Sequence, residues 1–187
     1  IDTGSAIDWN TGYEGGQQGE LPRWKPGTSY SLSQVLTDPK GDIRFVWNLN
    51  RHQQFLDLGK AYWYTGKEEF AREFIDEVTT WISQNPYHQS VNWLDTYEIA
   101  LRGIFWVFGY LFFFSSECVD EKFFCRFYHS LFLQAHTVHD LVQSSIKTLE
   151  THHLVASAVF LYLAGTVFPE YQHSKQFSKC GWDILQW

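Results

Sequence analysis

The chain has 187 residues, a formal net charge of −7 and 19% aromatic residues. This length suits one domain with a buried core, and the aromatic content fits a large helical core or a carbohydrate cleft, where flat rings stack on sugar faces. Because the chain is acidic and contains no basic run, we expect no nucleic-acid partner. The apolar run 103–114 is shorter than the ~20 residues that cross a bilayer, so we also expect no membrane insertion.

Cysteine and histidine spacings do not indicate a metal site. Cys118, Cys125 and Cys180 cannot all pair within the chain, so we predict that they are buried or free thiols. His136 and His139 have a spacing that could hold a metal, but an exposed helix face is the simpler interpretation. We therefore expect neither a metal nor a cofactor. No signal peptide is visible, and a sequence without Met fits a processed or truncated piece.

Residues 1–40 differ in composition from the rest of the chain. They carry much of its Gly and Pro, which predicts an extended N-terminal arm with turns and no helix. The arm also holds four large aromatic residues: Trp9, Tyr13, Trp24 and Tyr30. We therefore expect the arm to lie across an apolar surface instead of moving freely in solvent.

A helical period begins at Asp42, whose side chain suits an N-cap, and continues through the remainder of the chain. The pattern predicts helices at 42–65, 67–83, about 93–114, about 120–143, 149–168 and 170–187. No strand-like alternation competes with it, so we predict an all-α fold. Short connections make neighbouring helices antiparallel, but the pattern alone does not choose between a closed bundle and an arc of a larger toroid.

His152 and His153 stand at the start of a helix that is otherwise apolar up to Pro169. One interpretation is that the two imidazoles cap the helix and satisfy backbone groups. The other is that they face a functional cleft. Successive helical residues point about 100° apart, so one histidine can face a cleft while the other anchors the helix.

Five segments follow one another along the chain in a recognisable order. They are GDIRFVWNLNRHQ at 41–53, AY and TG within 61–66, WISQNP at 81–86, VNW and EIALR within 91–102, and HHL and FPE within 152–170. In this order they resemble the N-terminal helical domain of the heparinase II/III type of polysaccharide lyases, a group that includes alginate lyases. The resemblance implies that 41–187 is an incomplete (α/α) toroid of antiparallel helical hairpins, normally followed by further helices and a β-sandwich that this chain lacks.

The resemblance implies β-elimination in a polysaccharide that contains uronic acid. The proton on C5 becomes acidic enough to remove only when the neighbouring carboxylate is neutralised. The resemblance gives this role to His152 and makes His153 its anchor. The partner is then an acidic polysaccharide, and we expect a periplasmic or secreted location because the substrate is a large polymer. Ser157 and Asn48 stand where many relatives carry Glu, which weakens the expected support of the site.

The resemblance also places five residues at helix starts or on inner faces along the substrate cleft. They are Asn50, Arg51, Asn92, Trp93 and Trp47. A Trp there can stack on a sugar ring, and Arg51 can hold a carboxylate or sulfate. The alternative is structural: the Trp residues belong to the core, and Arg51 pairs with an acid such as Glu98. Glu98 and Arg102 have an i,i+4 spacing, so we expect them to pair as structural residues.

Two groups that the reaction needs are expected outside this sequence. In the family, a catalytic Tyr follows the histidine helix by several tens of residues and a proton-transfer His comes later, so both should lie in the rest of the polypeptide, beyond Trp187; Tyr162 and Tyr171 do not match. We therefore expect little or no lyase activity from the isolated chain. Two functions stay open: part of a lyase for heparan sulfate-like or alginate-like glycans, and a non-catalytic helical module that binds carbohydrate or serves as a scaffold.

Overall fold

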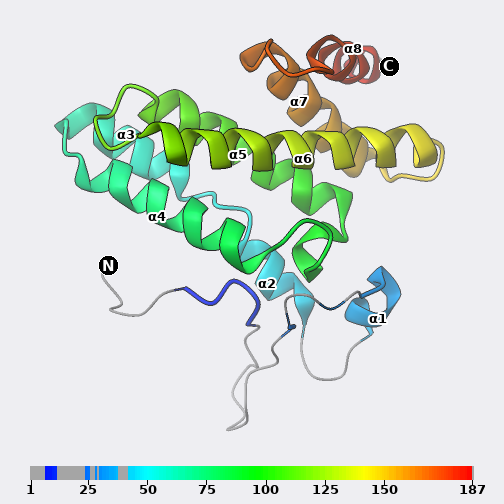
Figure 1. Ribbon diagram of the computed structural model, residues 1–187. Coiled ribbons are helices and arrows are strands. Elements are labelled where there is room, and N and C mark those ends of the chain that lie inside the picture. Colours follow the sequence, from blue (N-terminus) through cyan, green and yellow to red (C-terminus); the bar gives the residue numbers. More distant parts are fainter. Residues whose placement is uncertain (1–6, 12–23, 26–27, 29, 38–41, 187) are drawn as a thin grey trace, which may run out of the picture.

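The computed structural model describes residues 7–11, 24–25, 28, 30–37 and 42–186. The regular elements in this part of the chain are all helices, which confirms the predicted all-α class (Figure 1). They are α1 (Leu32–Leu36), α2 (Ile43–Leu49), α3 (Phe55–Thr65), α4 (Glu69–Gln84), the 3-10 helix η1 (Val91–Trp93), α5 (Thr96–Phe113), α6 (Glu121–Ser145), α7 (Thr151–Val167) and α8 (Ser174–Leu185).

The long helices pack as three successive hairpins, α3 with α4, α5 with α6, and α7 with α8. Helix α5 lies between α3 and α7, and α6 contacts both α4 and α8, so the hairpins stand next to one another in chain order (Figure 1). This order agrees with the predicted succession of helical hairpins. An incomplete (α/α) toroid stays a prediction, because an arc of hairpins does not by itself define a ring.

Three aspartates define where helices begin. Asp42, Asp95 and Asp120 are the N-caps of α2, α5 and α6, and each side chain accepts hydrogen bonds from backbone N–H groups two or three residues later. An aspartate carboxylate satisfies donors that have no partner inside the helix. The helix starts predicted near these residues are therefore confirmed.

The single helix predicted over 42–65 is wrong, because the chain breaks between α2 and α3. His52 lies in this break with a left-handed backbone, φ 58°, and its side chain is fully buried. Its ring stacks on Phe55 at 4.9 Å, and its Nδ1 accepts a hydrogen bond from Nε1 of Trp106 at 2.8 Å. A non-glycine residue adopts positive φ only at an energetic cost, which these core contacts offset.

The N-terminal arm is anchored in the core by its tryptophans. Trp9 and Trp24 are buried, which confirms the expected apolar contact for the described part of the arm; Tyr13 is outside the described residues. The indole of Trp9 donates from Nε1 to Oγ1 of Thr80 on α4. The prediction of no helix in the arm is wrong, because α1 forms there behind a capping box that starts at Ser31.

Close packing of α5 on α7 depends on Gly103. A Cβ at this position would lie 2.3 Å from the ring of Phe160 on α7, so any larger residue would push the two helices apart. Glycine therefore allows α5 and α7 to approach closely at this point. The histidine pair lies about two turns away, at the N-terminal end of α7.

The three cysteines are free thiols, as predicted: Cys125 is exposed, and Cys118 and Cys180 are partly buried. Among the helices of the described ranges, none combines the length and the apolar character that a membrane span requires.

Asn50 joins three segments of the chain, which makes it a test of the fold. Its amide donates to the backbone oxygens of Trp9 (2.9 Å) and Val46 (2.6 Å) and accepts from Nε1 of Trp81 (2.6 Å). We expect Asn50→Ala to lower the free energy of unfolding by about 2 kcal/mol, because buried donors and acceptors lose their partner. The exposed Asn48→Ala on the same helix should change it by less than about 0.5 kcal/mol. Equal urea midpoints for the two variants would contradict this role.

Glu77 on α4 gives the fold a pH dependence. It is 7% exposed, and burial raises its pKa to about 7, against a hydrogen bond from Nε2 of Gln54 that lowers it. Because the folded-state pKa exceeds the unfolded value of 4.5, ionised Glu77 opposes folding, and this penalty grows as pH rises from 4.5 to 7. Glu77→Gln should therefore be more stable than wild type at pH 8, by up to about 3 kcal/mol, with the difference vanishing near pH 4.5. Urea unfolding across this pH range measures it, and Glu69→Gln, at an exposed position of the same helix, should show no comparable trend.

Candidate active site

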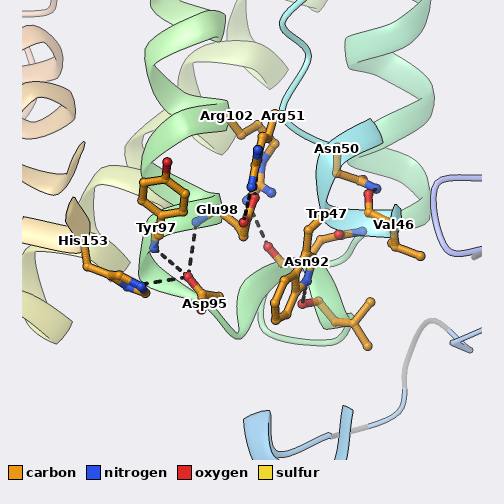
Figure 2. A network of polar contacts seen from close by, with 11 residues as sticks. Val46, Trp47, Asn50, Arg51, Asn92, Asp95, Tyr97, Glu98, Arg102 and His153 are labelled. Atoms are coloured by element: carbon orange, nitrogen blue, oxygen red, sulfur yellow. Dashed lines mark hydrogen bonds and ion pairs between the residues drawn. The ribbon is translucent and has the colours of Figure 1, made fainter. Parts of the chain in front are cut away.

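The two histidines lie in the first turn of α7, beside the first turn of α5. The side chain of His152 is 55% exposed, and its Nδ1 lies 3.3 Å from Oε2 of Glu150. The side chain of His153 is 21% exposed and points to α5, where its Nδ1 lies 3.8 Å from Oδ1 of Asp95 (Figure 2). The ring of Tyr97 contacts both imidazoles, with centroid distances of 5.1 and 5.3 Å. The two histidines thus have different surroundings, one open to solvent and one held between helices.

Asp95 is a site residue that the sequence did not indicate. Its carboxylate accepts from the backbone N–H groups of Tyr97 (2.8 Å) and Glu98 (3.3 Å), which fixes it next to His153. Ser157 lies one turn beyond His153, but it is fully buried, and its hydroxyl has no hydrogen-bond partner in the described part of the chain. The acid beside His153 therefore comes from the start of another helix, α5. The sequence indicates Asp95 only as a helix N-cap, and not as a neighbour of His153.

An open groove of about 620 Å³ runs between α5 and α7 and begins at His152. Its lining is mostly apolar and comprises Tyr97, Leu101, Ile104, Thr151, His152, Val155, Ala156 and Val159. His152 and Thr151 form its polar end. A flat apolar surface with a polar edge suits the face of a sugar ring.

Arg51 reaches from the break after α2 to the start of α5. Its Nε and Nη2 donate to the two carboxylate oxygens of Glu98, each at 2.7 Å, which makes a bidentate pair (Figure 2). Glu98 is 7% exposed, and its hydrogen bond raises the pKa of Arg51. The structural alternative for Arg51, a salt bridge with Glu98, is therefore present in the structure.

Arg102 forms no salt bridge with Glu98, whose ion pair is with Arg51, so the predicted i,i+4 pair of these residues is wrong. Arg102 is fully buried, and it donates to Oε1 of Gln134 at 2.9 Å and to the backbone oxygen of Asn92 at 3.1 Å. Its guanidinium also lies 4.2 Å from the ring centroid of Trp81. Glu98 pairs with Arg51 instead, in the bidentate geometry that makes Arg–carboxylate pairs strong.

The other four predicted substrate-binding side chains are buried: Asn50, Asn92, Trp47 and Trp93. The indoles of Trp47 and Trp93 donate to backbone oxygens of Val91 and Asn85, both at 3.1 Å. Asn92 donates to Oδ1 of Asn85 at 2.8 Å. The structure therefore favours the core alternative for both tryptophans. None of these four side chains lines the groove, and the hydrogen bonds of Trp47, Trp93 and Asn92 hold the segment before α5 in place.

One group of side chains in the described part of the chain brings potential metal ligands together. Ligand atoms of Glu150, His152 and His153 all lie within 4.8 Å of one another. His136 and His139, which we expected on an exposed helix face, are partly exposed and lie beside the carboxylate of Asp140, at 3.1 and 3.4 Å.

Fold and site together define an all-helical domain with a histidine-edged groove, and comparison with known proteins gives its family. Residues 4–187 match the family model described as Heparinase II/III N-terminus. The chain therefore belongs to this family, which confirms the resemblance carried by its motifs.

The relatives are longer proteins. A heparin-sulfate lyase of Bacteroides stercoris is 26% identical, over 79% of this chain and 24% of that protein. A solved heparinase III structure has a TM-score of 0.67 at 24% identity, and the match covers 81% of this chain and 26% of the other. A second heparinase III structure, with methylated lysines, has a TM-score of 0.61 at 24% identity, over 95% and 29%. The chain thus spans about a quarter of the length of these relatives.

The Arg51–Glu98 pair should stabilise the start of α5. We expect Arg51→Met to lower the free energy of unfolding by about 2 kcal/mol, because it leaves the buried carboxylate of Glu98 without its counter-ion. The matched control is Arg44→Met on α2, whose pair with Asp42 is solvent-exposed at 76% and 38%. The effect of this substitution should be smaller, because solvent screens an exposed ion pair. Urea unfolding compares the two, and a loss for Arg51→Met no larger than the control's would contradict the argument.

Proposed function

We propose that the chain is the N-terminal part of a polysaccharide lyase that cleaves uronic-acid-containing glycans, of the heparan sulfate or alginate type, by β-elimination. The observation that carries the proposal is the accessible His152 at the N-terminus of α7, on the edge of an open groove, in a chain of this family. The remaining catalytic groups, a Tyr and a His, would come from further polypeptide. The length of the relatives supports this division.

His152 supplies the group that neutralises the uronate carboxylate. The ring nitrogen that does not face Glu150 is free to donate a hydrogen bond to that carboxylate. The N-terminal end of α7 adds backbone dipoles that favour an anion at the same place. Both effects stabilise the enolate-like anion that forms when C5 loses its proton, so they act most strongly in the transition state.

His153 anchors the pair, and the groove receives the sugar. Asp95 and Tyr97 hold the imidazole of His153 against α5, which fixes the first turn of α7 and hence the direction of His152. Because Arg51 is paired with Glu98, the apolar groove carries more of the sugar contact than Arg51 does. Asn50, Asn92, Trp47 and Trp93 act indirectly, by holding the segments that frame the groove. Action on a large polymer favours a periplasmic or secreted location.

A non-catalytic module that binds carbohydrate or serves as a scaffold is the second candidate. The observation that favours it is the internal use of the predicted substrate-binding residues, since Arg51 is neutralised by Glu98 and both Trp47 and Trp93 are buried. Such a module would bind the glycan through the same groove without cleaving it.

His152→Ala in the intact protein tests the proposed chemistry. We expect kcat for release of unsaturated uronate from heparan sulfate or alginate, followed by ultraviolet absorbance, to fall about 100-fold or more, because one preorganised donor is lost. The thermal unfolding midpoint should stay unchanged, since the side chain is exposed. His136→Ala, on α6 and outside the groove, is the matched control and should keep the wild-type rate. An unchanged rate for His152→Ala would refute its role, and glycan binding without cleavage by the wild type would favour the second candidate.

A further inference from the structure

We propose that Glu150, His152 and His153 form a binding site for a divalent transition-metal ion of the Zn²⁺ class. The lyase chemistry proposed above uses no metal, so this site goes beyond it. The starting observation is that one ligand atom from each of these three residues lies within 4.8 Å of the other two.

The spacing suits a small ion with short bonds. Zinc–nitrogen and zinc–oxygen bonds of about 2.0–2.1 Å in a tetrahedron place neighbouring ligand atoms roughly 3.4 Å apart. The Nδ1 of His152 and Oε2 of Glu150 are already 3.3 Å apart. Both side chains are mostly exposed, 55% and 75%, so they can adjust to a bound ion without disturbing the core.

Asp95 gives the site a feature typical of histidine ligands. A histidine that binds a metal usually turns its other ring nitrogen to a carboxylate, which fixes the ring and raises its basicity. The Nδ1 of His153 faces the carboxylate of Asp95 at 3.8 Å, and two backbone N–H groups of α5 hold that carboxylate in place. Nε2 of His153 thus remains available as the ligand atom.

Charge and ligand type select the ion. The carboxylates of Glu150 and Asp95 place negative charge beside the ion, and Arg51, which lies near Asp95, is neutralised by Glu98. Two imidazoles and a carboxylate suit Zn²⁺, Ni²⁺ or Co²⁺, whereas Ca²⁺ and Mg²⁺ prefer oxygen ligands. Three protein ligands leave a fourth position open for water.

Such an ion would engage His152, the residue that the proposed function assigns to the uronate carboxylate. This consequence rests on the proposed function: a bound ion takes the imidazole out of its donor role, so Zn²⁺ is an inhibitor of the elimination. The binding itself does not depend on catalysis.

Calorimetric titration of the chelator-treated intact protein with Zn²⁺ tests the site. We expect the wild type to bind one more equivalent than His152→Gln and Glu150→Gln, or to bind it at least about tenfold more tightly. His136→Gln is the matched control, because His136 also lies beside a carboxylate, that of Asp140, but belongs to no group of three potential ligands in the described residues. This variant should keep the full stoichiometry. Identical titrations of wild type and His152→Gln would overturn the site.

A spectroscopic measurement removes the effect of other sites in the intact protein. Co²⁺ in a four-coordinate nitrogen–oxygen site gives visible absorption, and the wild-type minus His152→Gln difference should show it. The test uses substitutions of Glu150 and His152 because both side chains are exposed, so the variants should fold. Far-ultraviolet circular dichroism checks that they do. A flat difference spectrum overturns the site whether or not the protein is a lyase. Absence of uronate release from metal-free wild type would instead refute the proposed function and leave the binding result intact.

Discussion

The structure depends on the break in the helical chain between α2 and α3, where three consecutive polar residues point in three directions. Asn50 bonds to the arm and to α4, Arg51 pairs with Glu98 at the start of α5, and His52 accepts from Trp106 in the middle of α5. On an uninterrupted helix these side chains would follow one another at about 100° around a single axis. The left-handed backbone of His52 turns the chain so that all three reach their partners.

The same break positions the candidate site, although none of its residues lines the groove. The bidentate bond from Arg51 holds Glu98, which lies three residues after the N-cap Asp95. Asp95 in turn faces His153 on α7. A continuous path of contacts therefore runs from the break through the start of α5 to the histidine pair. Such contacts help to fix the direction of a side chain in the first turn of α7, which a directed hydrogen bond to an anion would require.

The helices and the histidine pair were predictable because their signals are local. Aspartate caps, apolar periods and Pro169 each act within a few residues, and they fix the starts of α5 and α6 and the end of α7. The break at His52 was not predictable, because helical spacing continues through it and the contacts that favour a left-handed residue include Trp9 and Trp106, which are distant in the sequence. Helical spacing likewise favours Arg102 as the partner of Glu98, whereas the structure has the alternative pair with Arg51, 47 residues away. The place of Asp95 beside His153 also depends on packing between helices that no local pattern encodes.

The electrostatics of the domain limit how it can meet an acidic glycan. With a net charge of −7, the chain repels a polyanion at long range, but salt screens this repulsion beyond about 8–10 Å. Under the proposed function attraction must then arise locally, and Arg51, which reaches the start of α5, is already paired with Glu98. What remains at the groove is His152, the N-terminal end of α7 and an apolar floor. In the proposed lyase, these groups recognise one carboxylate and one sugar face at short distance. Under the proposed function this domain therefore selects the uronate to be cleaved, and any broader attraction for a charged polymer has to come from elsewhere in the polypeptide.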